Sequence, residues 1–315
     1  MEVVLAFLWL IMGSAGLYFG AEGLVSGSAS VAIKAGIKVL VVGLTIVAFG
    51  TSSPELVISL SAALEGKGDI SAGNIIGSNI CNIALILGAA ALIRPIEVNK
   101  KIIRSDMPIM IAITLLFVLF AMDKHFDRIE GGIFIVMIIA YNFIAIYFSR
   151  KENQSQAARE AKEAANPERK LFFDILFIIG GIIILVAGAN LFLHGATDLA
   201  KIFGASDAVI GLTVVAFGTS LPELATSVVA AVKKEGDISI GNAIGSNIYN
   251  ILLIIGATAL ISPITITGIK NTDIGMLIFI SLLILPLAGF GLKLNRPKGV
   301  LLLSLYAGYM FYLFQ

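Results

Sequence analysis

A long stretch of this sequence is written twice, and each copy carries a single glutamate inside an apolar segment. The copies read GLTIVAFGTSSPEL then GDISAGNIIGSNICNIALILG (43–56, 68–88), and GLTVVAFGTSLPEL then GDISIGNAIGSNIYNILLIIG (211–224, 236–256). Glu55 and Glu223 lie 168 positions apart (223 − 55), and that offset holds without a gap from Gly20/Gly188 to Pro95/Pro263. A duplicated segment with an intramembrane carboxylate in each half predicts a transporter whose site lies between the halves.

The composition places the chain in a membrane. It is 58% hydrophobic and 14% charged, whereas soluble domains carry roughly 25% charged residues. Apolar runs long enough to cross a bilayer follow one another almost from end to end. The chain begins with an apolar run from Val3 and no basic segment before it, which favours a first spanning helix over a cleaved signal peptide. Cys81 is the one cysteine, so no internal disulfide forms, and we expect it to pack as a small apolar residue.

The apolar runs predict an all-α polytopic membrane protein of ten transmembrane helices, five in each repeat. Residues 1–149 hold helices at 3–30, 39–64, 70–93, 105–122 and 130–149; residues 171–315 hold helices at 171–198, 207–232, 238–261, 273–291 and 299–314. Residues 150–170 (RKENQSQAAREAKEAANPERK) break the pattern and predict a cytoplasmic linker.

The basic residues set the orientation of these helices. All but five of the 22 lysines and arginines fall in the loops of one face, which the positive-inside rule puts in the cytoplasm, with both termini extracellular. An odd number of helices per repeat inverts the second repeat relative to the first. Glu55 and Glu223 each lie about 16 residues into their helix, roughly 24 Å along it. Entering from opposite faces, both arrive in the central part of the membrane.

The residues around each glutamate supply oxygen ligands. Pro54 and Pro222 lack an N–H and displace the carbonyls of Gly50 and Gly218 four residues back, so the helix opens there. Exposed backbone oxygen at this depth is tolerated where it lines a cavity or binds an ion. The carbonyls from Ala48 to Thr51 and from Ala216 to Thr219 therefore turn inward, beside the hydroxyls of Thr51, Ser52, Thr219 and Ser220. Hard oxygens with two carboxylates suit Na⁺ or Ca²⁺.

The second motif, GNIIGSN and GNAIGSN, continues the pocket on the next helix. Glycines four apart allow helices 70–93 and 238–261 to approach their neighbours closely. Further oxygens come from Ser78 and Ser246 and, one helical turn onward, from Asn82 and Asn250. These groups are neutral, so the pocket carries a formal charge of −2. We expect packing or backbone-capping roles for Asn74, Asn79, Asn242 and Asn247, and helix caps at Asp69 and Asp237.

The paired GTSxPE and GNxxGSN motifs resemble the two α-repeats of the sodium/calcium exchanger branch of the calcium/cation antiporter superfamily, over nearly the whole chain. The resemblance implies a core of helices 2, 3, 7 and 8, with helices 1 and 6 as a tilted pair that slides across it. It makes Glu55 and Glu223 ligands shared by Ca²⁺ and Na⁺, with the carbonyls of Thr51 and Thr219 completing the Ca²⁺ site. It assigns one Na⁺ site to the Ala48 carbonyl, Ser52 and Ser78, and another to Ala216, Ser220 and Ser246.

Asn250 bears on the choice of ions. In the family that this chain resembles, potassium-dependent members and some microbial ones carry aspartate there, and potassium-independent animal exchangers carry asparagine, so we expect K⁺ to be dispensable. The chain lacks the GNAxE-type signature of the proton/calcium exchangers. It also lacks room in the linker for the large regulatory domains of the animal proteins.

The sequence thus predicts a secondary antiporter that exports Ca²⁺ in exchange for Na⁺ across the plasma membrane by alternating access. The alternatives are a related antiporter with another counter-ion (H⁺/Ca²⁺, or Na⁺ with K⁺ or Li⁺) and a passive cation channel. An intramembrane hydrolase would need a nucleophile with a base, and Ser52 and Ser220 have no His or Lys at a suitable spacing. We expect no cofactor, no nucleic acid and no obligatory protein partner; the partners are the lipid bilayer and the transported Na⁺ and Ca²⁺.

Overall fold

A computed structural model of the protein describes residues 2–153, 170–202 and 216–313. Within them, seven helical segments are long and apolar enough to cross a membrane: Val3–Lys34, Gly68–Ile93, Ile102–Asp123, Arg128–Ser149, Leu171–Leu199, Gly236–Ile261 and Asn271–Leu292. An eighth is the pair Val39–Thr51 and Ser53–Leu64, bent by 47° at its break. The protein is therefore a helical membrane protein, and most of the expected helices are in place.

Two of the ten expected helices are not among these eight segments. The seventh, expected at 207–232, is described from Ala216 onward, as α12 and α13; residues 207–215 lie outside the described residues. The tenth is α17, whose first turn contains Arg296 and Lys298. Most of the expected linker, 154–169, also lies outside the described residues.

The first repeat comprises α1 (Glu2–Lys34), α2 (Val39–Val42), η1 (Gly43–Val47), α3 (Ala48–Thr51), α4 (Ser53–Leu64), α5 (Gly68–Ile80), η2 (Cys81–Ile86), α6 (Leu87–Ile93), β1 (Ile96–Glu97), η3 (Ile102–Asp106), α7 (Met107–Phe120), η4 (Ala121–Asp123), β2 (His125–Phe126) and α8 (Arg128–Asn153). The second comprises α10 (Leu171–Ile202), α12 (Ala216–Thr219), α13 (Leu221–Val232), α14 (Gly236–Tyr249), η6 (Asn250–Ile255), α15 (Gly256–Ile261), β3 (Ile264–Thr265), α16 (Asn271–Gly289), η7 (Phe290–Leu292), β4 (Lys293–Leu294) and α17 (Arg296–Leu313).

Two short ribbons tie the repeats together. β1 pairs antiparallel with β4, and β2 pairs antiparallel with β3, so each ribbon takes one strand from each repeat. At the 168-residue offset, β1 corresponds to β3 and β2 corresponds to β4. The two ribbons are therefore equivalent under an exchange of the repeats. The 168-residue offset, found in the sequence up to Pro95 and Pro263, thus continues to the strands that precede the last helix of each repeat.

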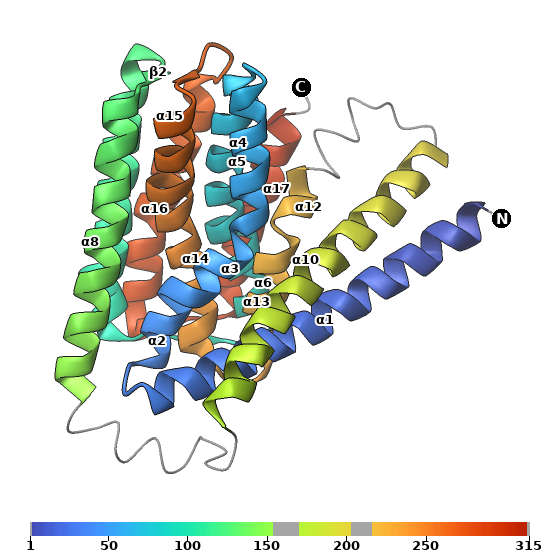
Figure 1. Ribbon diagram of the computed structural model, residues 1–315, viewed down its shortest axis with the longest axis vertical. Coiled ribbons are helices and arrows are strands. Elements are labelled where there is room, and N and C mark those ends of the chain that lie inside the picture. Colours follow the sequence, from blue (N-terminus) through green and yellow to red (C-terminus); the bar gives the residue numbers. More distant parts are fainter. Residues whose placement is uncertain (1, 154–169, 203–215, 314–315) are drawn as a thin grey trace.

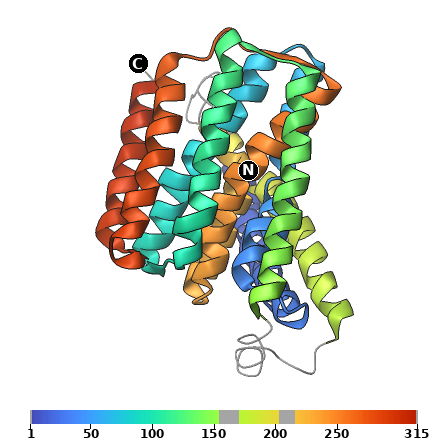
Figure 2. The same cartoon turned by 90° about the vertical axis from the view of Figure 1, so that its left-hand side faces the viewer.

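α1 and α10 form a tilted pair that crosses one side of the molecule, while the other helices stand upright beside it (Figures 1 and 2). The two helices run antiparallel, as inverted copies must, and pack through glycines. A Cβ on Gly20 would lie 2.6 Å from the Leu185 nitrogen, and one on Gly188 would lie 2.6 Å from the Leu17 nitrogen. Only residues without a side chain allow the backbones to approach so closely. Lys34 of α1 also pairs with Asp174 of α10.

The helices at the centre are interrupted within the GTSxPE motifs, but two residues after the glycines at which the sequence predicted the opening. Ser52 separates α3 from α4 with φ −83° and ψ 6°, and Ser220 separates α12 from α13 with φ −88° and ψ 5°. Proline occupies the first turn of α4 and of α13, where its missing N–H costs no helical hydrogen bond. Asn82 lies within the π-helical segment η2, and Asn250 begins the π-helical segment η6. The sequence did not indicate either segment. Such segments occur often at functional sites.

The core lies between the repeats. In an apolar 18-residue stretch of each helix, 78% is buried for Gly68–Ile93 and for Gly236–Ile261, whereas 22% is buried for Val3–Lys34. Large apolar side chains of the outer helices remain exposed on the surface of the protein, as lipid-facing helices require. The two innermost helices therefore carry the GNxxGSN motifs, and the outer helices shield them.

The close packing of α1 on α10 yields a first prediction. Replacing Gly188 by valine should force the two backbones apart, since its Cβ alone would lie 2.6 Å from a main-chain nitrogen; such overpacking costs about 1–3 kcal/mol. We expect a lower melting temperature of the purified protein. Gly180→Val on the same helix is the matched control, because nothing lies within 4 Å of its Cβ position. Equal melting temperatures for the two variants would contradict this packing of the pair.

Candidate cation-binding site

The two glutamates meet between the repeats. Glu55 lies in the first turn of α4 and is 0% exposed; Glu223 lies in the first turn of α13 and is 1% exposed. Each carboxylate is within electrostatic range of the other. The Ser52 hydroxyl donates a hydrogen bond of 2.9 Å to Oε1 of Glu223, so the break in one repeat touches the carboxylate of the other. The inverted helices thus bring both charges to one place, as the sequence predicted.

Neutral oxygens are buried in the protein interior along with the two carboxylates. Thr51, Ser52, Ser78, Asn82, Thr219, Ser220, Ser246 and Asn250 are all buried. Seven buried oxygens of the predicted site have no hydrogen-bond partner among the described residues: Oε1 and Oε2 of Glu55, Oε2 of Glu223, Oγ of Ser220 and Ser246, and Oδ1 of Asn82 and Asn250. An unpaired buried acceptor costs about 1–3 kcal/mol, and more when it is charged. Cations are the partners that would satisfy all seven together.

Asn74 and Asn242 hold the glutamate backbones. The Asn74 amide donates to the Glu55 carbonyl oxygen (3.4 Å) and to the Ser59 hydroxyl (2.9 Å). Asn242 repeats the arrangement with the Glu223 carbonyl oxygen (3.3 Å) and the Ser227 hydroxyl (3.0 Å). These bonds tie α4 to α5 and α13 to α14. The expected backbone-capping role of these two asparagines is confirmed, and the serines, which the sequence reasoning missed, recur at the same 168-residue offset.

Asn242 has a further partner in the other repeat. The Thr51 hydroxyl, whose oxygen lies 3.3 Å from the Ala48 carbonyl oxygen, donates to Oδ1 of Asn242 at 3.1 Å. The Ala48 carbonyl also accepts the Ser52 N–H at 3.0 Å, so it remains in a helical hydrogen bond. A carbonyl oxygen has two lone pairs, and this bond leaves one for a ligand. Ala216 begins α12 at the equivalent position.

Four asparagines form two amide pairs across the repeats. Asn82 donates to Oδ1 of Asn247 at 3.3 Å, and Asn250 donates to Oδ1 of Asn79 at 3.0 Å. The two bonds correspond to each other at the 168-residue offset. The η2 segment that contains Asn82 packs against α13, and the η6 segment that begins with Asn250 packs against α4. Each amide pair therefore lies beside the helix that carries one of the glutamates.

The expectation that Asp69 caps its own helix is wrong. No side chain caps the start of α5. The Asp69 carboxylate instead accepts the N–H groups of Thr267 and Gly268 at 2.7 and 2.8 Å, together with the Thr267 hydroxyl at 3.1 Å. It therefore holds the loop before α16, because that loop presents three donors that a carboxylate can accept at once.

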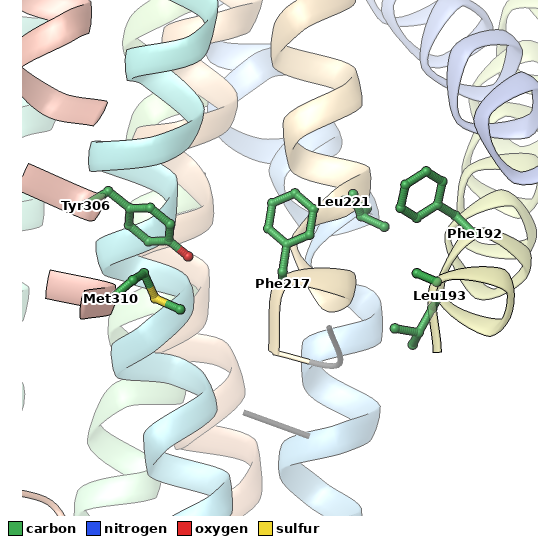
Figure 3. A pocket seen from close by; sticks show the side chains of 7 residues that line it. Phe192, Leu193, Phe217, Leu221, Tyr306 and Met310 are labelled. Carbon is green, nitrogen blue, oxygen red and sulfur yellow. The ribbon is translucent and has the colours of Figure 1, made fainter. Parts of the chain in front are cut away.

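An apolar pocket of 340 Å³ lies between α10, the broken helix of the second repeat and α17 (Figure 3). Its lining is Phe192, Leu193, Ala196, Phe217, Leu221, Tyr306 and Met310. The Tyr306 hydroxyl lies within interaction range of the Cys81 thiol, one residue before Asn82. The pocket thus extends from the tilted pair towards the polar centre, but its lining contains no charged side chain.

The site draws on two carboxylates and neutral oxygens, and within the described ranges no group of three or more His, Cys, Asp or Glu side chains is arranged to hold a metal ion. Among the predicted ligands, the side chains from α3–α4, α5–η2, α13 and α14–η6 are buried. Inverted copies that enclose a buried pocket of hard oxygens define an ion-transporting membrane protein.

Comparisons with known proteins agree with that class. The sequence model of the sodium/calcium exchanger protein family matches residues 5–147 and 173–315, so the chain belongs to this family. It is 36% identical over 318 residues to the putative antiporter CaxA of Alkalimonas amylolytica, covering 99% of this chain and all of that one. It is 33% identical over 349 residues to the sodium/calcium exchanger MaX1 of Methanosarcina acetivorans, covering 99% of each. A solved structure of the sodium-calcium exchanger NCX_Mj, soaked with 10 mM Na⁺ and zero Ca²⁺, matches with a TM-score of 0.83 and 34% identity over 97% of both chains.

The asparagine that holds the Glu223 backbone yields the second prediction. Asn242→Leu would leave the Glu223 carbonyl and the Ser227 and Thr51 hydroxyls without this partner. Each orphaned buried group costs about 1–3 kcal/mol. We expect a lower melting temperature than for Asn74→Leu, since Asn74 bonds with two groups rather than three. The measurement is thermal unfolding of both purified variants, and the reverse order would contradict these assignments.

Proposed function

We propose that this protein is a secondary antiporter that exchanges Na⁺ for Ca²⁺ by alternating access. The observation that carries the proposal is the cluster of unpartnered buried oxygens, which includes carboxylate oxygens from both repeats. A formal charge of −2 inside a membrane is costly unless a cation balances it. One Ca²⁺ balances the pocket, and several Na⁺ ions occupy the same oxygens. The two loads therefore compete, and that competition makes the exchange obligatory.

The ligand roles follow the resemblance to the family's α-repeats. Glu55 and Glu223, with the carbonyls of Thr51 and Thr219, form the central Ca²⁺ site. The Ala48 carbonyl with Ser52 and Ser78 forms one Na⁺ site; Ala216, Ser220 and Ser246 form the other; and Asn82 and Asn250 border the centre. The burial of the described side chains in this set supports the assignment.

The membrane arrangement belongs to the same proposal. Residues 1–149 and 171–315 form inverted five-helix repeats joined by a cytoplasmic linker at 150–170, with both termini extracellular, in the plasma membrane. The tilted pair of α1 and α10 slides across the upright helices, and the apolar pocket of Figure 3 lies on the boundary between them. Ca²⁺ leaves the cell because the inward sodium gradient drives the exchange.

Other counter-ions and passive conduction make different predictions for the same vesicles. An H⁺/Ca²⁺ exchanger transports Ca²⁺ in response to a pH gradient in the absence of Na⁺. An antiporter of Na⁺ with K⁺ or Li⁺ transports Na⁺ in the absence of Ca²⁺. A passive channel cannot move Ca²⁺ uphill. Na⁺-gradient-driven accumulation of ⁴⁵Ca²⁺ in proteoliposomes, without a pH gradient, separates all of these.

Either central carboxylate should be indispensable. Glu55→Gln or Glu223→Gln keeps the shape of the side chain but removes one of the two charges that balance a divalent ion. We expect at least a tenfold loss of Na⁺-driven ⁴⁵Ca²⁺ flux, since a lost carboxylate ligand costs more than about 1.4 kcal/mol. Glu65→Gln is the control, because Glu65 is exposed and pairs with Lys67 after the end of α4. Near-normal flux in either central variant would refute the ligand assignment.

The exchange should also run without K⁺. The Asn250 side chain is a neutral amide, so Ca²⁺ alone neutralises the two carboxylates and no further monovalent cation is needed. We expect unchanged Na⁺-driven ⁴⁵Ca²⁺ flux when choline replaces K⁺ on both sides of the membrane. Flux that stops in choline and returns with K⁺ would show that the neutral side chain at Asn250 does not make transport independent of K⁺.

A further inference from the structure

We propose that Met110 and Asn247 are positioning residues that fix which end of the Asn82 amide faces the cations. The inference rests on the proposed function only in taking the pocket to bind Ca²⁺. The oxygen and nitrogen ends of an amide are alike in shape, so the surrounding hydrogen bonds decide which end points where. For a cation ligand the difference is decisive, because the oxygen binds a cation and the NH₂ group repels it.

The hydrogen bonds that orient Asn82 begin at the sulfur of Met110, which can only accept a hydrogen bond. The Met110 thioether sulfur lies 3.5 Å from Nδ2 of Asn247, and a thioether has no proton to give. The Asn247 NH₂ group is therefore directed at Met110, and its Oδ1 faces Asn82. Asn82 must donate to that oxygen, as it does at 3.3 Å. Its own Oδ1 is left buried and without a partner among the described residues, which is the arrangement of a ligand.

The other repeat lacks this anchor. Asn79 corresponds to Asn247, and Asn250 corresponds to Asn82, with the same bond between them. The residue that corresponds to Met110 at the 168-residue offset is Ile278, which offers no acceptor. Nδ2 of Asn79 accordingly has no hydrogen-bond partner in the described part of the chain. The Asn79–Asn250 pair can therefore reverse both amides without losing a bond, whereas the Asn247–Asn82 pair cannot.

The anchor matters most when the pocket holds no metal. The carboxylates then attract the NH₂ end of a nearby amide, and η2 packs against the helix of Glu223. Without Met110, Asn82 would turn its NH₂ group inward, and an incoming Ca²⁺ would have to turn it back. Met110 lies on α7, outside the helices that carry the motifs, and is completely buried. Met110 thus lies outside the pocket and keeps Oδ1 of Asn82 oriented for the cation.

The test is equilibrium ⁴⁵Ca²⁺ binding to the purified full-length protein, without Na⁺. Met110→Leu keeps the volume of the side chain and removes the acceptor, and it should weaken Ca²⁺ binding about three- to tenfold. Met110→Ile, which copies the residue of the other repeat, should do the same and serves if the leucine variant does not fold. Met107→Leu is the matched control: Met107 is on the same helix, equally buried, and makes no side-chain hydrogen bond that the structure shows.

A background substitution separates positioning from packing. In Asn82→Asp both ends of the side chain are oxygens, so its orientation no longer matters, and Asn247 must turn to donate to it. Adding Met110→Leu to that background should cause no loss of Ca²⁺ affinity. An equal loss in both backgrounds, an equal loss for Met107→Leu, or no loss for either Met110 variant would overturn the proposal. So would a wild-type protein that binds no Ca²⁺, whereas Ca²⁺ binding without Na⁺-driven flux would overturn the proposed exchange and leave the positioning test intact.

Discussion

Two carboxylates buried side by side inside a membrane protein are the constraint on which the rest of this structure depends. Each is costly alone, and together they repel each other. The surrounding elements all lower that cost. The breaks at Ser52 and Ser220 bring hydroxyls beside the charges, and Asn74 and Asn242 occupy the main-chain carbonyls of the glutamates. What remains unpaired among the described residues is a set of buried oxygens from both repeats, which a bound cation would satisfy.

Each repeat completes the pocket of the other. The bond from Ser52 to Glu223, the bond from Thr51 to Asn242 and both amide pairs cross between the repeats. A single repeat would bury one carboxylate without these partners. The antiparallel arrangement of the two copies lets equivalent residues of each repeat bond with the other. Equivalent positions that carry different residues, such as Met110 and Ile278, then mark places where the two repeats have different roles.

The repeat in the sequence sufficed to predict that two carboxylates are buried together, that their helices break and that hydroxyl side chains are buried with them, because charged and polar residues inside apolar helices are costly and usually functional. It could not predict bonds between repeats, since these depend on how far one inverted copy is shifted along the other. Asp69 shows what local sequence could not predict. Its place at a helix start indicated a cap, but the loop at Thr267 and Gly268 offers three donors that local sequence cannot reveal. The π-helical segments that contain Asn82 and Asn250 and the thioether of Met110 likewise left no periodic signal.

The Ser52 hydroxyl, which is bonded to Glu223, shows how the pocket can serve a hydrogen bond and a cation at once. Ser52 donates its proton to Glu223, and both lone pairs of its oxygen remain for a metal ion. Because the proton is engaged by the carboxylate, the lone pairs of the oxygen can face a cation while this bond stays intact. Ser220 has no such bond in the described structure. The two serines therefore differ although they correspond at the 168-residue offset: in the described residues the Ser52 hydroxyl is bonded to the carboxylate of the other repeat, and the Ser220 hydroxyl is not.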